Sequence, residues 1–254
     1  MSEKRTVAII QARMSSSRLP GKVLADLGGQ PALAWMTRRA ARAARIDDIV
    51  VATTTDASDD PVAAWCQAQD VRMYRGSMHD VLDRYLGAAR ESNADIIVRL
   101  TGDCPFIDPH LLDDNLKTFH EHRPQLDFAA NRLPGDRTVP IGLDTEICTR
   151  AALERAGREA TEPHQREHAM PYFYENPEKF NILHIRHTPD YGHLRWTLDT
   201  PEDLALLRAI VAHFPNDEFS WLDVLKLVEE HPELNEINAG VRHKDYREVD
   251  DRQP

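Results

Sequence analysis

Cationic and hydroxyl side chains are concentrated in the loop that follows the first apolar run of the chain. Residues 7–10 are apolar throughout, which is typical of a buried strand. Arg13, Arg18 and Lys22 come next, and three serines stand between the first two of them. Arginine presents a planar fork of donors and lysine a point charge, and both suit a phosphate group. The loop therefore indicates an anion site, and a solvated basic turn is the alternative interpretation.

Two aspartates stand where they could complete such a site with a metal ion. Asp103 lies in a Gly-Asp-Cys-Pro turn after the apolar run 95–100, and Asp199 follows the run 194–198. Mg²⁺ prefers a few carboxylates together with phosphate oxygens, so two carboxylates on one rim suit it. The alternatives are a turn aspartate that bonds its own backbone and a helix-capping aspartate. Thr200 can provide the cap, which leaves Asp199 available to the rim.

The order of apolar and amphipathic segments predicts the sheet that brings these residues together. Up to about residue 125, short apolar strands alternate with helices, which is typical of a parallel sheet with helices on both faces. Ligands bind at the carboxyl ends of such strands, so Arg13, Arg75 and Asp103 are expected at one rim. The strands are expected at 7–10, 48–54, 71–74 and 95–100, and the helices at 32–44, 58–69 with Ser58 as cap, 78–92 and 108–120.

The pattern changes after Asp127. Residues 131–146 are rich in proline, glycine and charge, which indicates an insertion or a lid that faces the substrate. Thr200 is expected to cap a helix that has proline at its first position and acids in its first turn. The remaining helices are expected at 149–158, 162–174 with a break at Pro171, 200–213 and 219–230, the remaining strands at 181–187 and 194–198, and a charged tail from Asn235.

Length, charge and cysteine content narrow the class of protein. The chain has 254 residues and a formal net charge of −11, which does not fit a nucleic-acid binder, so no nucleic-acid partner is expected. Its three cysteines are scattered, form no C-x-x-C pair and indicate a reducing compartment. No apolar stretch approaches the roughly 20 residues that span a bilayer, and the N-terminus lacks the apolar core of a signal peptide. We therefore expect a cytoplasmic protein without a membrane partner.

One helical segment admits a different function. His164, Glu167 and His168 match H-x-x-E-H, in which two histidines bind zinc and the glutamate acts as base. A third protein ligand must come from elsewhere, and the alternative is a polar helix beside a substrate pocket. Neither G-x-G-x-x-G, nor G-x-x-x-x-G-K-[ST], nor G-x-S-x-G occurs. A phosphate site must therefore use the loop from Arg13 to Lys22.

Three motifs, in their order along the chain, resemble those of the cytidylyltransferases that make CMP-sugars, such as the CMP-KDO synthetases and acylneuraminate cytidylyltransferases. They are Ala-Arg-Met-Ser-Ser-Ser-Arg-Leu-Pro-Gly-Lys at 12–22, Gly-Asp-Cys-Pro at 102–105 and Trp-Thr-Leu-Asp-Thr-Pro-Glu-Asp at 196–203. The sequence resembles most the spore coat polysaccharide biosynthesis protein F group, over about residues 6–247. It departs from the KDO and sialic acid enzymes at Gln11, where they have proline, and at the stretch 79–85. These departures concern the acceptor more than the chemistry.

The resemblance implies an α/β, Rossmann-like nucleotide-diphospho-sugar transferase fold, with a mainly parallel sheet, helices on both faces and a small antiparallel extension. Residues 1–254 are then one nucleotidyltransferase domain, with a nucleotide-binding half at 1–125, an acceptor and dimerisation half at 126–200, and C-terminal helices and a tail at 200–254. It also implies roles for single residues. Lys22 and Arg13 are catalytic, Asp103 and Asp199 bind Mg²⁺, and the nucleotide-binding residues are Arg13, Ser17, Arg18, Lys22, Arg75 and Thr101.

The function that these expectations predict is nucleotidyl transfer. CMP from CTP is joined to a sugar or sugar-like acceptor and pyrophosphate is released, for surface polysaccharide or glycan biosynthesis. Mg²⁺ is the expected cofactor, and family habit predicts a homodimer. The acceptor is expected to contact Asp144 of the 131–146 loop together with Arg166 and His168. A zinc metallohydrolase at 164–168 and a non-catalytic nucleotide-binding protein of the same fold are the alternatives.

Overall fold

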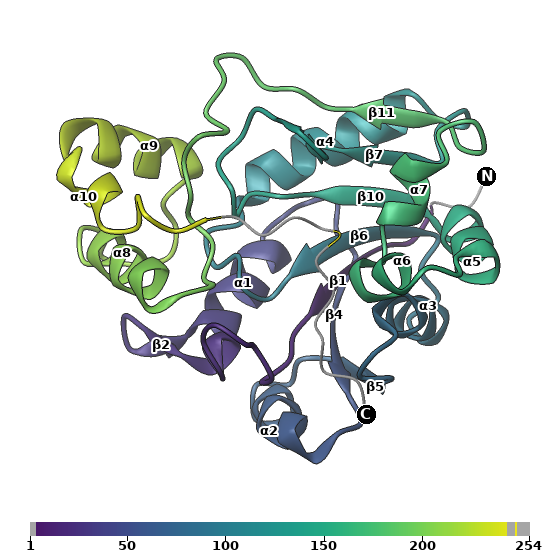
Figure 1. Cartoon of the computed structure of the whole chain (residues 1–254), viewed down its shortest axis with the longest axis horizontal. Helices are drawn as coiled ribbons and strands as arrows, with labels where there is room; N and C mark the ends of the chain where they lie inside the picture. The colour runs from purple at the N-terminus through teal and green to yellow at the C-terminus, as the bar shows by residue number, and fades with distance from the viewer. Residues whose placement is uncertain (1–3, 243–246, 248–254) are drawn as a thin grey trace.

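A seven-stranded sheet organises the part of the chain that the computed structural model describes, which is residues 4–242 and Arg247 (Figure 1). The strands are β1 Thr6–Gln11, β4 Asp48–Thr54, β5 Met73–Gly76, β6 Ile96–Thr101, β7 Phe128–Ala130, β10 Glu146–Thr149 and β11 Ile182–His184. Their order across the sheet is β11-β7-β10-β6-β1-β4-β5. Within this sheet β10 runs antiparallel to its neighbours β6 and β7, and the other pairs are parallel.

The two faces of the sheet bury alternate side chains of the same strands. Val7 and Ile9 of β1 lie in one core with helices α3 and α5, whereas Ala8 and Ile10 lie in a second core with α1, α2 and α4. All four side chains are fully buried. Burial on both faces explains why the parallel strands read as continuous apolar runs. The helices are α1 Ala32–Ala41, α2 Asp60–Ala68, α3 Val81–Glu91, α4 Pro109–Glu121 and α5 Arg150–Glu159.

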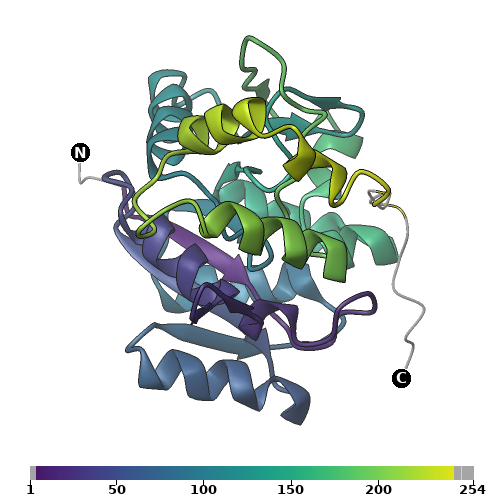
Figure 2. The same ribbon diagram turned by 90° about the vertical axis from the view of Figure 1, so that its left-hand side faces the viewer.

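A third core holds the C-terminal helices against the rim of the sheet. Helices α8 Pro201–Val211, α9 Trp221–Glu230 and α10 Glu233–Glu236 pack with Trp35, Phe106 and Trp196. They form a group of their own at the left of Figure 1, and Figure 2 shows α8 and α9 from the front. The short helices α6 Pro163–His168 and α7 Pro171–Glu175 lie near α3 and α5 on the opposite side. In the described part of the chain, no helix is long and apolar enough to cross a membrane.

Short elements complete the rim. Two antiparallel hairpins are formed by β2 Asp26–Leu27 with β3 Gln30–Pro31, and by β8 Arg132–Leu133 with β9 Asp136–Arg137. Two 3₁₀ turns are η1 Lys22–Leu24 and η2 Ala57–Asp59. The reversed strand β10 and these hairpins correspond to the small antiparallel part expected from the sequence, so the predicted fold class is confirmed.

Several predicted elements are confirmed and others are wrong. Thr149 and Thr200 accept hydrogen bonds from the first turns of α5 and α8, as expected. Ser58 is not the cap before α2, because Asp56 accepts a hydrogen bond from the Ser58 amide and caps η2 instead. The strands β7 and β10 have three and four residues, and the sequence patterns did not indicate them. The predicted charged tail lies mostly outside the described residues beyond Arg242.

The segment 194–198 was expected to be a strand and is not one. It pairs with its neighbour through a single parallel bridge between Ile141 and Arg195. Gly142 follows this bridge with φ of 111°, a value that turns the neighbouring chain away from an extended path. A Cβ atom at Gly142 would lie 2.7 Å from the carbonyl oxygen of Trp196. The two backbones therefore approach closely, and glycine is required at this position.

The close approach at Gly142 predicts a specific loss of stability. Gly142→Ala should lower the free energy of unfolding about 1–3 kcal/mol more than Gly135→Ala, because the added methyl group overpacks against the backbone of Trp196. Gly135 is the matched control, since its φ is also positive, at 75°, but nothing lies within 4 Å of its Cβ position. Urea unfolding of both variants measures the difference. Equal losses of unfolding free energy in the two variants would show that the positive φ alone, and not the contact with Trp196, accounts for the effect.

Candidate active site

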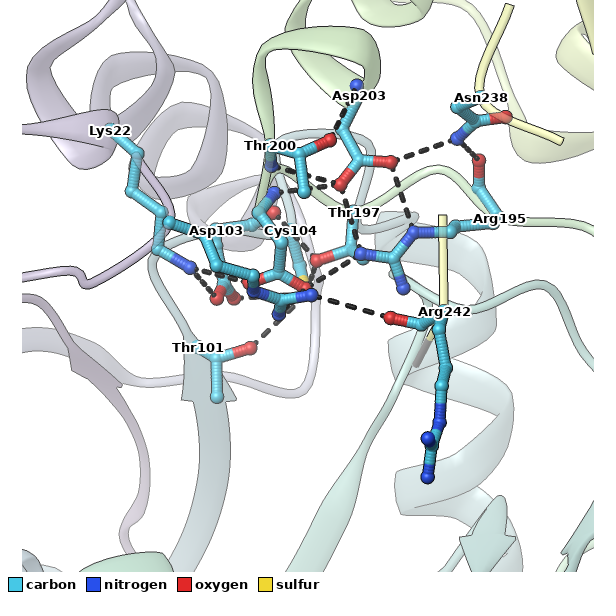
Figure 3. A network of polar contacts seen from close by, with 12 residues as sticks. Lys22, Thr101, Asp103, Cys104, Arg195, Thr197, Thr200, Asp203, Asn238 and Arg242 are labelled. Atoms are coloured by element: carbon cyan, nitrogen blue, oxygen red, sulfur yellow. Dashed lines mark hydrogen bonds and ion pairs between the residues drawn. The ribbon is translucent and has the colours of Figure 1, made fainter. Parts of the chain in front are cut away.

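The ammonium group of Lys22 lies between two carboxylates at the rim of the sheet (Figure 3). Lys22 Nζ donates to Asp103 Oδ2 at 2.6 Å and to Asp199 Oδ1 at 2.8 Å. Lys22 opens η1 after the loop that follows β1, Asp103 lies in the turn after β6, and Asp199 precedes α8. The parallel neighbours β1 and β6 end at the same edge, which brings the first two residues together. The expectation that these residues share one rim is confirmed.

The charges at this site hold one another in the ionised state. Burial lowers the pKa of Lys22, but the two carboxylates outweigh it and raise the pKa above its usual value. Burial raises the pKa of Asp199, but Lys22, Arg18 and Arg195 hold it well below its usual range. At neutral pH, Lys22 is therefore a cation and Asp199 an anion.

A second layer of charged groups fixes the orientation of Asp199. Arg195 Nη2 donates to Asp199 Oδ2 at 2.7 Å, and Arg18 Nη2 lies 3.0 Å from the same oxygen. Asp203 is fully buried and accepts hydrogen bonds from Arg195 and from the backbone amide of Asp199. Asn238 donates to Asp203 and to the carbonyl oxygen of Arg195. One oxygen of Asp199 is thus held by arginines, and the other faces Lys22.

Backbone contacts join the two segments that carry the carboxylates. The carbonyl oxygen of Asp103 accepts hydrogen bonds from the Leu198 amide at 2.8 Å and from the Thr197 hydroxyl at 3.1 Å. Cys104 is buried beneath this turn, with its sulfur 3.1 Å from the hydroxyl of Thr101. Burial raises the pKa of the Cys104 thiol well above its usual value, so it is not a thiolate nucleophile. These contacts hold residues 194–198 against the turn of Asp103, so this segment supports the site and does not extend the sheet.

The charged cluster opens onto a cavity of about 640 Å³. Its walls combine the loop after β1, the ends of β6 and β10, the first turn of α3, the end of α6 and the β8–β9 hairpin. This volume is in the range of a site for a nucleotide or another substrate of that size. The charged side chains that line it are Arg13, Arg18, Lys22, Arg84, Arg99, Asp103, Arg132, Asp136, Arg137, Asp144, Glu146, Glu167, His168 and Asp199.

A family model for cytidylyltransferases matches residues 7–218, which span Lys22, Asp103 and Asp199. The chain belongs to the cytidylyltransferase family.

Relatives of known name or structure agree with this membership. The spore coat polysaccharide biosynthesis protein SpsF of Bacillus subtilis is 33% identical over 212 residues, which are 80% of this chain and 84% of that protein. A solved cytidylyltransferase from Leptospira borgpetersenii is 35% identical with a TM-score of 0.88, over 95% of this chain and 100% of that one. A solved CMP:2-keto-3-deoxy-manno-octonic acid synthetase complexed with CTP shares the fold, with a TM-score of 0.64, 22% identity, and 83% and 99% coverage.

Most of the site residues expected from the sequence line the cavity of this cytidylyltransferase. Ser17 of the cationic loop and Thr101 at the end of β6 do so, and so do Asp144 and His168. The sequence predicted Asp203 only as an acid in the first turn of a helix and not as part of the site, although it stands at the third position of a capping box that begins with Thr200. That capping pattern was the available signal, but it does not indicate the contact with Arg195, which depends on the turn of the chain between residues 195 and 203.

Two of the expected site residues are directed elsewhere. Arg75 Nε donates to the carbonyl oxygen of Thr54 at 2.7 Å, and its Nη2 lies 2.8 Å from Asp60 Oδ1. Arg166 Nε donates to Asp80 Oδ2 at 2.9 Å, at the N-terminus of α3. Neither arginine is among the residues that line the cavity. Their expected contacts with nucleotide and acceptor therefore gain no support from the geometry.

The H-x-x-E-H segment of this cytidylyltransferase does not assemble a zinc site. His164 Nε2 lies 2.9 Å from Glu175 of α7, whereas His168 lines the cavity. Glu167 lies 3.9 Å from Arg13. Within residues 4–242 and 247, no group of three or more His, Cys, Asp or Glu side chains is placed to hold a metal ion. Together with the family membership, this arrangement does not favour the zinc metallohydrolase.

The charges around Asp199 predict a pH-dependent stability difference. Asp199→Asn should lower the free energy of unfolding at pH 7, because Lys22, Arg18 and Arg195 lose a shared counter-charge. The folded-state pKa of Asp199 is lowered, so its stabilisation is present above the unfolded carboxyl pKa of about 3.9 and is lost as pH falls below it.

Urea unfolding of the wild type and Asp199→Asn measures this difference at several pH values. It should narrow between pH values of about 5 and 3. Asp114→Asn is the control, because Asp114 is exposed on α4 and is none of the residues that form this network. A difference that stays constant over the whole range would contradict the assignment of the charge effect to Asp199.

Proposed function

We propose that this cytidylyltransferase joins CMP from CTP to a sugar or sugar-like acceptor and releases pyrophosphate, for the biosynthesis of a surface polysaccharide or glycan. The names of two relatives support the proposal, since SpsF is a spore coat polysaccharide biosynthesis protein and the synthetase neighbour was solved with CTP. The observation that carries it is the convergence of Lys22, Asp103 and Asp199 in the wall of a cavity that Arg13 and Arg18 also line.

In this proposal the phosphates of CTP lie against the loop after β1. Arg13, Ser17, Arg18 and Lys22 all line the cavity on that side. Arginine forks and a lysine ammonium form charge-assisted hydrogen bonds with phosphate oxygens. Before CTP binds, the ammonium of Lys22 donates to the two carboxylates, and the phosphates then offer it a second set of acceptors.

The pair Asp103 and Asp199 fits the magnesium ion that the family implies. One oxygen of each carboxylate already lies within 2.8 Å of a single cationic nitrogen, so both point towards one small positive centre. Two carboxylates supplemented by phosphate oxygens and water are a usual donor set for Mg²⁺. Bound there, the ion would neutralise charge on the phosphates and act as a Lewis acid. Arg195 and Asp203 would keep Asp199 oriented towards it.

Transfer proceeds by in-line attack of an acceptor oxygen on the α-phosphorus of CTP. The new bond joins this oxygen to phosphorus, a hydroxyl acceptor gives up its proton to water, and the bond from the α-phosphorus to the bridging oxygen breaks. Pyrophosphate leaves with that oxygen and the bonding electron pair. Negative charge accumulates on the leaving group, and Lys22 and Arg13 are the cations of the loop that stabilise it. This assignment makes them the catalytic residues of the proposal.

The acceptor binds in the half of the cavity formed by the β8–β9 hairpin and the end of α6. Asp144 receives a hydrogen bond from Arg137 Nη2 at 3.0 Å and lies 3.9 Å from Arg132, so its carboxylate is held in place at this wall. His168 lines the same cavity. Both side chains are therefore proposed to contact the acceptor. The homodimer and the cytoplasmic location expected from the sequence stay predictions.

A pyrophosphate-release screen tests the proposed reaction. Four nucleoside triphosphates are combined with sugar acids, sugar phosphates and alditol phosphates, with Mg²⁺ or with a chelator. We expect release with CTP and at least one acceptor, and loss of release on chelation. Release with a purine nucleotide alone would overturn the nucleotide assignment. Undiminished release in chelator would overturn the metal assignment.

Replacing Lys22 tests its catalytic role. Lys22→Met should lower kcat about a hundred- to a thousandfold, the usual loss when one donor to a developing charge is removed. Lys226→Met is the matched control, since the side chain of Lys226 is 74% exposed and pairs only with Glu230 of the same helix among the described residues. Steady-state pyrophosphate release measures both variants. A kcat for Lys22→Met within a few-fold of the wild type would remove Lys22 from the mechanism.

A further inference from the structure

Arg84 is a buried cation in the wall of the cavity. It belongs to the first turns of α3, is 1% exposed and lines the cavity together with Val81. Its i,i+4 spacing from Asp80 is typical of a solvated salt bridge on a helix surface. The structure differs, because Asp80 caps α3 and binds Arg166, and Arg84 is directed into the molecule.

The hydrogen bonds of Arg84 leave much of its donor capacity unused. Nη1 donates to the carbonyl oxygens of Ser77 at 2.7 Å and Met78 at 3.3 Å. Nε is buried without a hydrogen-bond partner. In residues 4–242 and Arg247, no carboxylate forms an ion pair with Arg84, and Nη2 forms no hydrogen bond. A buried charge without a counter-ion is unfavourable, so an anionic ligand group that binds Arg84 would offset the cost of burying its charge.

Other guanidinium groups in the same cavity already have carboxylate partners. Arg99 forms an ion pair with Glu146, and Arg137 forms one with Asp144. Arg13 lies 3.9 Å from Glu167. Arg84 differs from them because, within the described chain, its hydrogen-bond acceptors are the backbone carbonyl groups of Ser77 and Met78.

Loss of hydration is the main unfavourable effect on the charge of Arg84. Burial lowers the pKa of its guanidinium most, Tyr85 raises this pKa, Arg13 lowers it, and Asp59 and Asp80 raise it to a smaller extent. Arg13 and Arg84 line the same cavity. An anion bound between these two arginines would offset the loss of hydration of the buried guanidinium.

The packing of Arg84 fixes its stem. A Cβ atom at Gly76 would lie 2.8 Å from Arg84 Cγ, so the glycine at the end of β5 leaves the space that this stem occupies. Tyr85 beside it is fully buried and donates to the carbonyl oxygen of Leu100 at 2.8 Å. The guanidinium is therefore held against the cavity by its surroundings, as expected of a binding group rather than a mobile surface chain.

The position of α3 relative to the sheet favours the nucleotide over the acceptor as the ligand of Arg84. α3 packs against β5, β4 and β1, and the loop with Arg13 and Lys22 follows β1. The acceptor wall proposed above combines the end of α6, which also packs against α3, with the β8–β9 hairpin, between β7 and β10 on the far side of β6. Arg84 lines the cavity with the cationic Arg13 of the loop after β1, and this shared positive charge suits the phosphates of the nucleotide. We propose that Arg84, with Arg13, binds the pyrophosphate part of CTP. This inference rests on the proposed function and adds a residue that the phosphate loop does not contain.

Calorimetric titration of the full chain, with Mg²⁺ and without acceptor, tests this assignment. Arg84→Met should weaken the binding of CTP and of inorganic pyrophosphate about tenfold to a hundredfold, the loss expected for a charge-assisted donor. Binding of CMP should stay unchanged. Arg90→Met is the matched control on the same helix, because the side chain of Arg90 is 61% exposed, and it should bind all three ligands as the wild type does.

Arg84→Lys keeps the positive charge and tests the assignment in case Arg84→Met does not fold. It should show a smaller loss for CTP and pyrophosphate, again with CMP unchanged. Equal weakening of CMP, or a change only in the KM of the acceptor, would overturn the pyrophosphate assignment. Wild-type affinity in either Arg84 variant would overturn it as well. Absence of CTP binding in the wild type would instead overturn the proposed function, so the two failures are distinguishable.

Discussion

The arrangement of the rim depends on one ammonium group held between two carboxylates. Lys22 joins Asp103, which lies 81 residues away in sequence, to Asp199, which lies 177 residues away. A buried ion pair of this kind contributes little net stability, because desolvation offsets much of the attraction. The contribution of Lys22 is geometric, because its positive charge allows two carboxylates that would otherwise repel each other to lie close together. The fully buried Asp203 then fixes the geometry through Arg195 and through the backbone of Asp199.

The parallel part of the sheet and the antiparallel strand β10 contribute differently to the cavity. β1 and β6 end at the same edge and present the cationic loop from Arg13 to Lys22 and the turn of Asp103. β10 runs the opposite way, so the chain that connects β7 to β10 returns to this edge and forms the opposing wall. Within the described structure, cationic loop and hairpin thus face each other across one cavity. This division agrees with a reaction between two substrates.

The sequence predicted the central strands and the catalytic candidates because their signals are local or strongly repeated. β1, β4 and β6 are buried on both faces and therefore read as apolar runs. Asp103 and Asp199 could be located because each follows an apolar run and stands beside a turn or cap. β7 and β10 have three and four residues, too few for a clear pattern. The burial of Arg84 could not be predicted, because its i,i+4 spacing from Asp80 does not reveal that Asp80 binds Arg166 of another helix.

The reversal of β10 has a consequence for how this scaffold can diversify. The wall proposed for the acceptor is a connection between two strands, and its ends are tied by Asn131, which binds the backbone of Leu143 and of Thr145. The segment between Asn131 and Leu143 can vary in length and composition while β7 and β10 keep their pairing. On the proposed assignment, acceptor choice can therefore change through this connection and the end of α6, while the strands that position Lys22 and Asp103 stay as they are.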